Sequence, residues 1–509
     1  SLSVLILYWN PNDYPRIWEN TGWPLKTMDE PKPKAVNYEL IMEIRLSFLG
    51  AVQNVTGSSY LIETKDNRVL VDCGLYQERQ LKGRNWQDFP VPPGSLQAVL
   101  LTHAHLDHCG LLPKLVRSGF GAVYLSPEAT AEIARIMLMD SARVQEEDAV
   151  AKRKRHEREG RKGPYPEIPL YTAEDAQAVF PLLSPVKYDA PFSVVDGVEV
   201  VFHNAGHVLG SAMIETVLST NGRRRTMVFS GDIGRWNRLI LPDPTVFSKA
   251  DYVAVESTYG DRLHDKEKDV EEILANVINQ TREAGGNVVI PSFALERAQE
   301  ILYHLNRLCI QNRIPRLMVF VDSPMAASIT QVFERHPELF DKETSEFLRE
   351  NGSPFNFPNL RLIKTVDESK TINYIKGTVV IIAGSGMCNG GRVKHHLVYN
   401  ISRPESTILF VGYQAEGTLG REIVNGAREV RILGQKHLVK AKVVQMGGFS
   451  AHADRDELLK WLSGFKKPPS HLFVTHGEAN TAESFADLVA RTMDWPVSVP
   501  KYLDQVILS

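Results

Sequence analysis

The chain has 509 residues, of which 43% are hydrophobic and 23% charged, so it has enough apolar material for a large buried core, and its length alone predicts two or more domains. Its net charge of −3 argues against a protein that coats nucleic acid through a broadly basic surface, although a local groove is compatible with it. The four cysteines have no CxxC spacing, so they suggest neither a disulfide framework nor a thiolate zinc site, and we expect small buried hydrophobes.

Membrane and secretory signals are not evident. No apolar run approaches the roughly 20 residues that span a bilayer, and residues 2–8 are too short and lack the basic flank of a signal peptide. We therefore expect a cytoplasmic protein without a membrane partner.

Residues 1–41 contain several Pro, Trp and Asn residues and show no hydrophobic period, so we expect an irregular extension. Regular alternation begins with Ile44, Leu46 and Phe48, which predicts a half-buried strand. Met42 is thus a candidate for the natural start, and we expect the extension to be dispensable.

Two further strands are predicted at residues 60–62 and 69–71, and the second leads into Asp72-Cys73-Gly74. Taken alone, Asp72 would be a turn residue. It precedes the densest group of possible ligands in the chain.

That group follows the apolar residues 98–101 and reads His103-Ala104-His105-Leu106-Asp107-His108. Strand alternation would place His103, His105 and Asp107 on one face, and a turn beginning at Asp107 would bring His108 in from another direction. Imidazole and carboxylate groups suit Zn²⁺. A solvated loop with chance histidines is the alternative, which three histidines and an aspartate in this register make improbable.

After a helix predicted at residues 111–117, residues 127–158 predict a long helix, capped by Ser126 and with Pro127 at its first position. A basic run, Lys152-Arg153-Lys154-Arg155-His156, lies near its end. Such a run is typical of a solvated helix face. Contact with RNA is the less favoured alternative, because Glu157 and Glu159 dilute the charge.

Strands predicted at residues 198–202 and 227–229 are followed by His207 and Asp232, each between glycines. Alone, His207 would be a structural histidine and Asp232 a turn former. After the histidine-rich hexad they favour a metal site, because two metals need a third histidine and a carboxylate able to bridge them.

A second domain is predicted from alternating helices and apolar strands. Helices are expected at residues 265–281 and 296–308, and strands at residues 288–290, 317–321, 379–383 and 407–411. This alternation is typical of βαβ units and a parallel sheet. Residues 440–445, the segment ending in His452, and a strand that delivers His476 are expected to return to the first domain.

Ser292, Ser323 and Ser385 each follow a strand of this second domain. In an open parallel sheet the turns at the carboxyl ends of the strands line one crevice, so we expect the three serines to face the metals and to bind RNA phosphates. Gly386 would let a phosphate approach the backbone closely. For Ser292 and Ser323, a role only in capping the following helix is an equally favoured alternative to binding phosphate.

The motifs together resemble a known family. Asp72, the hexad, His207 and Asp232 match four motifs of the metallo-β-lactamase superfamily. Glu256 in Glu256-Ser257-Thr258-Tyr259-Gly260, His452 in Phe449-Ser450-Ala451-His452 and His476 in Thr475-His476-Gly477-Glu478 match three motifs of its β-CASP subfamily. The chain is similar to the bacterial and archaeal relatives of the endonuclease that cleaves pre-mRNA before polyadenylation.

The resemblance implies an α/β fold, a metallo-β-lactamase αββα sandwich with an inserted Rossmann-like β-CASP domain. It divides the chain into the extension (residues 1–41), the first part of the sandwich (42–260), the β-CASP domain (261–439) and the second part of the sandwich (440–509).

It also implies two Zn²⁺ ions per chain, one held by His103, His105 and His207 and the other by Asp107, His108 and His476, with Asp232 bridging. Asp72 would orient a ligand histidine or the attacking water. His452, oriented by Glu256, would be the general acid. The expected activity is zinc-dependent hydrolysis of single-stranded RNA, endonucleolytic or from the 5′ end, in RNA processing or decay. Relatives are often dimers.

Three alternatives stay open. A DNA nuclease of the same superfamily is the nearest, but the DNA-acting branch lacks the histidine that stands here at His476. A small-molecule metallo-hydrolase would not need an inserted domain of roughly 180 residues. A non-enzymatic scaffold subunit that had lost its metals would lack some of the ligand residues.

Overall fold

The computed structural model describes residues 44–220, 222–264 and 270–509. The expected irregular extension at residues 1–41, the possible start at Met42 and the first residues of the helix expected at 265–281 lie outside this part. None of the helices in the described part has the length and apolar composition needed to cross a bilayer.

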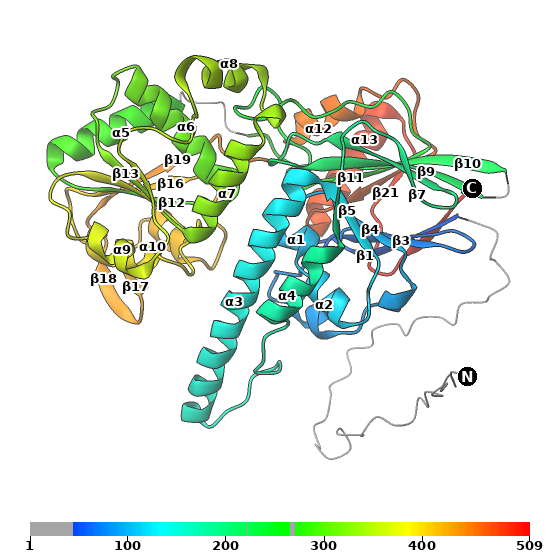
Figure 1. Ribbon diagram of the computed structural model, residues 1–509, viewed down its shortest axis with the longest axis horizontal. Coiled ribbons are helices and arrows are strands. Elements are labelled where there is room, and N and C mark those ends of the chain that lie inside the picture. The colour runs from blue at the N-terminus through cyan, green and yellow to red at the C-terminus, as the bar shows by residue number, and fades with distance from the viewer. Residues whose placement is uncertain (1–43, 221, 265–269) are drawn as a thin grey trace, which may run out of the picture. The chain divides into compact units, whose positions relative to one another are not determined.

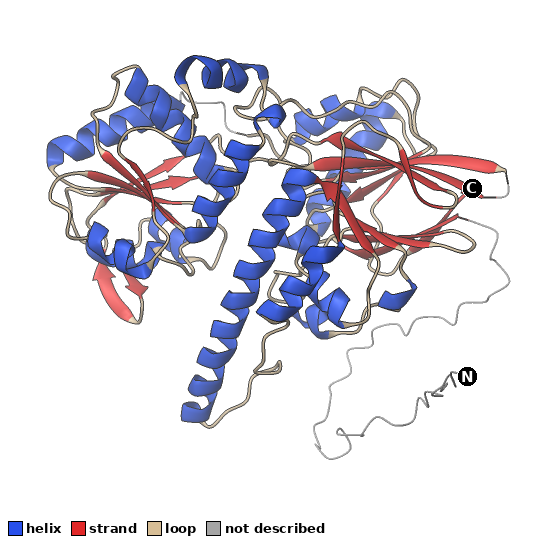
Figure 2. Ribbon diagram, in the orientation of Figure 1, coloured by secondary structure: helices blue, strands red, loops and turns tan. Residues whose placement is uncertain are grey.

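Two seven-stranded mixed sheets form the first domain (Figures 1 and 2). The first sheet has the order β22-β1-β2-β3-β4-β5-β6, and its strands are β1 (Ile44–Gly50), β2 (Ser59–Glu63), β3 (Arg68–Val71), β4 (Ala98–Leu100), β5 (Val123–Pro127), β6 (Leu183–Val186) and β22 (Gln505–Leu508). The second has the order β21-β20-β11-β10-β9-β8-β7, with β7 (Phe192–Val195), β8 (Val198–Asn204), β9 (Ala212–Thr220), β10 (Arg223–Phe229), β11 (Tyr252–Glu256), β20 (His471–Thr475) and β21 (Val497–Ser498).

Alternation along the strands explains the layers. In β3, Val69 and Val71 enter the core between the two sheets, whereas Leu70 points to the helices outside. In β20, Phe473 enters the same central core, and Leu472 and Val474 pack under the helices of the other side. The outer helices are α1 (Leu106–Cys109), α2 (Leu112–Arg117), α3 (Glu128–Glu159) and α4 (Ala173–Val179) beside the first sheet, and α12 (Arg455–Leu462) and α13 (Ala479–Met493) beside the second. The αββα sandwich is thus confirmed.

The inserted domain is built on a sheet of order β14-β13-β15-β12-β16-β19, in which every pair is parallel. Its strands are β12 (Val288–Pro291), β13 (Met318–Asp322), β14 (Leu360–Leu362), β15 (Val379–Ala383), β16 (Thr407–Val411) and β19 (Lys442–Met446). Its helices are α5 (Val270–Ala284), α6 (Arg297–Ile310), α7 (Pro324–Arg335), α8 (Lys342–Asn351), α9 (Val366–Ile372), α10 (Val393–Asn400) and α11 (Leu419–Val424), and β17 (Glu429–Ile432) and β18 (Gln435–Leu438) form a hairpin.

The strand at the end of this domain differs from the expectation. We expected residues 440–445 to return to the sandwich, but β19 pairs in parallel with β16 from Thr407↔Lys442 to Val411↔Met446 and forms an edge of the inserted sheet. Backbone pairing with β16 decides its place, and the chain leaves the inserted sheet only after Met446.

The start of α3 also differs. Ser126 was expected to cap the helix, but it is the fourth residue of β5, and its hydroxyl donates to the carbonyl of Pro127. Pro127 is the N-cap, without a side-chain hydrogen bond. The strand pairing of β5 with β6 continues through Pro127 and holds Ser126 in extended backbone.

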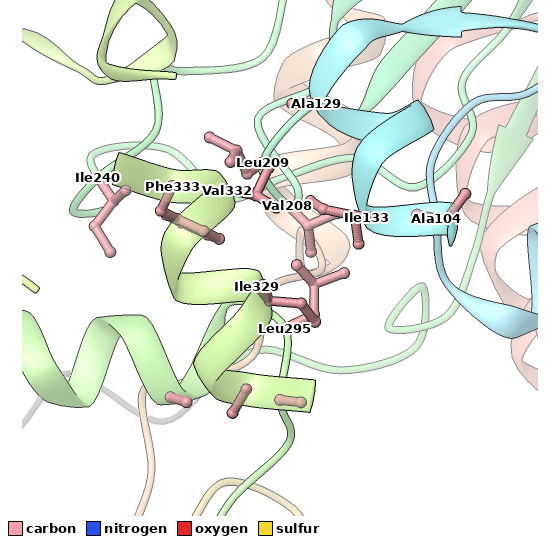
Figure 3. Close-up of a cluster of buried hydrophobic side chains, with 14 of the residues drawn as sticks. Ala104, Ala129, Ile133, Val208, Leu209, Ile240, Leu295, Ile329, Val332 and Phe333 are labelled. Carbon is pink, nitrogen blue, oxygen red and sulfur yellow. The ribbon is translucent and has the colours of Figure 1, made fainter. Parts of the chain in front are cut away.

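One hydrophobic cluster joins the loops of the sandwich to the inserted domain. Ala104 and the pair Val208 and Leu209 belong to it, together with Leu295 and with Ile329, Val332 and Phe333 of α7 (Figure 3). Ala104 lies between two histidines of the hexad, and Val208 follows His207. The segments that carry candidate ligands are therefore packed directly against the inserted domain.

Candidate metal centre

The hexad lies at the carboxyl end of β4, but it is not extended throughout. The strand ends at Leu100, and a helical turn, α1, starts at Leu106. Asp107 is consequently not on one face with His103 and His105, which corrects the alternation argument: period-two alternation ends where the backbone becomes helical. Instead, Asp107 and His108 both point toward a second group of ligands.

The first group consists of His103, His105, His207 and Asp232. The Nδ1 atom of His105 lies 3.0 Å from Nε2 of His103 and 3.3 Å from Nε2 of His207. Both of those Nε2 atoms lie 3.4 Å from Oδ2 of Asp232.

The second group consists of Asp107, His108 and His476. The Nε2 atoms of the two histidines are 3.0 Å apart, and Nε2 of His476 is 3.7 Å from Oδ2 of Asp107. Oδ1 of Asp232 lies 3.2 Å from Nε2 of His108 and 3.5 Å from Nε2 of His476. One carboxylate therefore presents a different oxygen to each group.

These spacings fit metal ions. Ligands bound tetrahedrally at about 2.0–2.1 Å lie about 3.3 Å from one another, close to the distances in both groups. Oδ1 of Asp232 and Nδ1 of His207 are buried and have no hydrogen-bond partner among the described residues. A buried carboxylate oxygen without a hydrogen bond is costly unless positive charge compensates it. The donor set is that of a metal-binding centre.

Neighbouring side chains orient the ligands of the second group. Asp72 Oδ2 lies 2.7 Å from Nδ1 of His108, and the same carboxylate accepts hydrogen bonds from the hydroxyls of Ser58 and Thr102. The hydroxyl of Thr258 lies 3.1 Å from Nδ1 of His476. Each contact leaves the Nε2 atom of the histidine pointing into the group.

Burial lowers the pKa of every histidine in the two groups, but nearby carboxylates outweigh it only in the second group. Burial lowers the pKa of His103 to about 3, and it lowers the pKa values of His105 and His207 as well. These imidazoles are neutral, which is the form that binds metals. For His108 and His476 the effect of burial is outweighed by carboxylates, chiefly Asp232, which raise both pKa values.

His452 and Glu256 form a third arrangement beside Asp232. Nδ1 of His452 lies 3.2 Å from both oxygens of Glu256, which is fully buried, and 3.9 Å from Oδ2 of Asp232. Glu256 also accepts the backbone N–H of Ile233 at 2.6 Å, which fixes its carboxylate. Burial lowers the pKa of His452, but Glu256 and then Asp232 outweigh it and raise the pKa to about 9.

Two supporting residues were missed in the sequence. The Nε2–H group of His264 donates to the carbonyl of His452 at 2.9 Å, and the backbone N–H of His264 donates to Asp454, the N-cap of α12. Thr258 was recognised only as a member of the motif around Glu256, without a role of its own. The spacing Asp454-x-x-Glu457 is typical of a capping box and can be recognised in the sequence. Nothing in the sequence around His264 indicated its contact with His452.

The three serine turns do come together. They follow β12, β15 and β13, which are neighbours in the sheet, and a Cβ added at Gly384 would lie 3.7 Å from Oγ of Ser323 and 3.9 Å from the carbonyl oxygen of Ser292. Ser323 caps α7 by accepting the N–H of Ala326, as the capping alternative had it. Ser292 caps no helix, because its hydroxyl donates to the carbonyl of Phe293.

The turn at Ser385 is more closed than expected. The N–H and the hydroxyl of Ser385 both reach the carbonyl of Gly390 at 3.3 Å. Gly386 is covered by the ring of Phe293, because a Cβ there would lie 2.9 Å from two ring carbons. Phe293, which is 48% exposed, was not anticipated as part of this edge.

The carboxyl edge of the inserted sheet adjoins the ligand loops. Glu296, which follows the Ser292 turn, accepts the N–H of Leu209, two residues after His207, at 3.2 Å. In addition, only the short segment after Met446 separates β19 from His452. The serine turns and the metal centre are thus connected through two segments of the chain.

Three family models match successive parts of the chain. Residues 53–274 match the metallo-beta-lactamase superfamily, residues 298–423 the Beta-Casp domain and residues 436–500 the Zn-dependent metallo-hydrolase RNA specificity domain. The fold is also found in a crystal structure of a protein of unknown function from Enterococcus faecalis V583, with a TM-score of 0.51, 12% identity and coverage of 92% of this chain and 100% of that one.

Several curated proteins are similar over most of their length. Ribonuclease TTHA0252 from Thermus thermophilus is 36% identical over 447 residues, which cover 88% of this chain and 96% of the relative. The RNase J-like protein of Methanocaldococcus jannaschii is 31% identical, covering 90% and 98%, and the transcription termination factor FttA of the same organism is 31% identical, covering 91% and 71%. The chain therefore belongs to the β-CASP family of the metallo-β-lactamase superfamily.

Proposed function

We propose that the protein is a zinc-dependent ribonuclease that uses two Zn²⁺ ions per chain to hydrolyse phosphodiester bonds of single-stranded RNA, in RNA processing or decay. The observation that carries the proposal is the carboxylate of Asp232, whose two oxygens face two separate ligand groups. Two close cations activate a water molecule and neutralise charge on both the attacking and the leaving oxygen of an in-line phosphoryl displacement.

The side chains of this centre have distinct tasks. His103, His105 and His207 would hold one ion, Asp107, His108 and His476 the other, and Asp232 both. Asp72 holds His108 with Nε2 directed inward, because it engages the Nδ1 atom. The segment after β3 packs closely against α1, because the backbone at Gly74 passes against the carbonyl of Asp107, where a Cβ has no room.

His452 would supply the proton to the leaving ribose oxygen. Glu256 engages its Nδ1 atom through both carboxylate oxygens, so Nε2 is the atom available to donate. A histidine held between carboxylates retains its proton at neutral pH, which is the state that a general acid requires. Glu256 acts through His452 and has a positioning role.

Ser292, Ser323, Ser385 and Gly386 would border the path of the RNA backbone. This assignment rests on their convergence at the carboxyl ends of neighbouring parallel strands and on the contact of Glu296 with the loop of His207. The names of the relatives, two of which are called ribonucleases, favour RNA over DNA as the substrate.

One assay tests the proposal. RNA labelled at the 5′ or 3′ end, DNA of matched sequence and a chromogenic β-lactam are each incubated with the zinc-loaded protein and with chelated protein. We expect cleavage of RNA alone, lost on chelation, and two zinc ions per chain by metal analysis. The two labels separate internal cleavage from cleavage that starts at the 5′ end. Hydrolysis of DNA or of the β-lactam at a comparable rate would contradict the assignment, as would active protein with one zinc or none.

A further inference from the structure

The distal end of α3 carries a concentrated positive charge. Residues 152–162 contain seven lysines and arginines, all exposed, against two glutamates, which leaves a charge of +5 in a chain whose net charge is −3. We call these residues the basic arm. In Figure 1 the helix reaches this end past α2 and α4.

The basic arm is held in a defined conformation. His156, the buried member of the segment, lies with Nδ1 2.5 Å from Oε1 of Glu167, and Arg153 donates to the carbonyl of Glu167 at 3.1 Å. Gly160 ends the helix in the left-handed conformation, with φ of 62°. The loop after the helix therefore folds back on His156, and the other lysines and arginines of the segment are exposed around this contact.

The other end of α3 adjoins the metal centre. The hydroxyl of Thr130 donates to the carbonyl of Gly210 at 2.6 Å, and Gly210 is three residues from His207. At 1.5 Å per residue, the distance along the helix from Thr130 to Lys152 is about 33 Å, and to Arg158 about 42 Å. The helix thus fixes the separation between the centre and the basic arm.

The middle of α3 does not continue the positive surface. Glu146, Glu147 and Asp148 lie between the two ends, and Glu147 and Asp148 are exposed. A polyanion would be repelled by this section and attracted beyond it. The contact at the basic arm is therefore separate from the contacts made at the metal centre.

We propose that the basic arm is a second binding site for RNA, which takes the sugar-phosphate backbone of the substrate about 33–42 Å along α3 from Thr130, the residue that contacts the loop of His207. The proposal rests on the proposed function. Exposed lysines and arginines bind phosphates through charge and without base specificity, so the site would favour long substrates of any sequence. A stacked strand advances about 3.4 Å per nucleotide, so about ten to twelve nucleotides are needed to span this length of α3.

The test replaces Lys152, Lys154, Arg155 and Arg158 together by Gln in the full chain. Arg153 and His156 are kept because they anchor the loop. The matched control replaces Lys249, Lys466, Lys467 and Lys501 by Gln, which removes the same charge from exposed positions of the sandwich. Two unstructured RNAs are compared, one of about five nucleotides and one of about forty, chosen on either side of the reach of the helix.

We expect the KM for the long RNA to rise about tenfold in the arm variant, with the short RNA and kcat unchanged and the control variant like the wild type. The slope of log Kd against log salt for the long RNA should fall in magnitude by about 3, since each lost phosphate contact removes about 0.7. An unchanged KM and slope for the long RNA would overturn the proposal, as would equal losses for both RNAs or in both variants. If the wild type cleaves neither RNA, the proposed function fails, and the difference in Kd between the two variants still decides the role of the basic arm.

Discussion

The two ligand groups of the centre share Asp232 and differ most clearly at His207, since in the first group the hydroxyl of Thr102 also contacts Nδ1 of His103 at 3.2 Å. In the first group, the Nδ1 atom of His207 is buried without a hydrogen-bond partner among the described residues. In the second group, Asp72 engages Nδ1 of His108 and Thr258 engages Nδ1 of His476. Packing therefore fixes His207, whereas hydrogen bonds fix the two histidines of the second group.

The two groups also differ in how far apart in the sequence their residues lie. His103 and His105 of the first group come from one loop, and His207 from the next part of the sandwich. The second group needs His476, which is 368 residues from His108 and reaches it only because β20 pairs with β11. All residues of the first group come from the part of the sandwich that precedes the inserted domain. The second group combines residues that precede this domain with one residue that follows it.

Removing the shared ligand should have the largest effect. In Asp232→Ala both groups lose an oxygen, so we expect metal content to fall from two ions to fewer than one per chain and RNA cleavage to fall more than about 10⁴-fold. Metal analysis after dialysis and single-turnover cleavage measure both effects. Retention of two ions would mean that the carboxylate is not shared. Circular dichroism controls for folding, which we expect to be less affected because the surrounding core is apolar.

Replacing His452, the proposed general acid, should spare the metals. We expect His452→Ala to keep both ions and its affinity for RNA but to slow cleavage by about 10²–10⁴-fold, the usual contribution of positioned proton transfer. Glu256→Gln should give a smaller loss of the same kind, since it acts through His452.

Metal content is the deciding control for His452. Its ring nitrogen, a carboxylate oxygen of Glu256 and one of Asp232 lie within 4.8 Å of one another and could themselves hold a cation. Loss of an ion in His452→Ala would therefore make this histidine a ligand and contradict its role as an acid.

Asp72→Asn tests whether the two ligand groups are supported separately. The amide lacks the charge that supports His108, so we expect affinity for the metal of the second group to fall about 10–100-fold, with the first group unaffected. Titration with a chelator, followed by metal analysis, should show one ion lost early. Ser58→Ala, which removes only a 3.2 Å hydrogen bond to the same carboxylate, is the control and should change affinity much less. Equal weakening of both ions would show that Asp72 supports the whole loop.

The smallest effect is expected at the serine turns. Ser385→Ala removes a hydroxyl that borders the proposed path of RNA, and we expect KM to rise several-fold with little change in melting temperature. Ser323→Ala is the matched comparison: because Ser323 also caps α7, this substitution should cost about 1 kcal/mol of stability, a loss not expected in Ser385→Ala. A lower melting temperature and an unchanged KM in Ser385→Ala would assign that serine to the stability of its own loop, where it contacts Gly390.

Sequence patterns predicted most of the elements because hydrophobic periodicity is a local property. The strands at residues 379–383 and 407–411 were predicted with their observed bounds, and the long helix within one residue of its observed ends. Local patterns failed where another segment decides the backbone. Ser126 looks like a helix cap but lies in a paired strand, and residues 442–446 join the inserted sheet because β16 offers them a partner.

The ligand types at the metal centre were readable from the sequence, since three histidines and an aspartate in six residues are hard to explain otherwise. Their arrangement was not readable, because it depends on strand ends that meet only in the folded chain. The backbone turns helical at Leu106 and sends Asp107 away from His103, and the two oxygens of Asp232 face different groups. The contact of His264 with His452 likewise has no local signal, because its two partners are far apart in the chain. Residue chemistry is thus determined by the sequence alone, whereas the division of those residues between two sites is decided by the packing of distant strands.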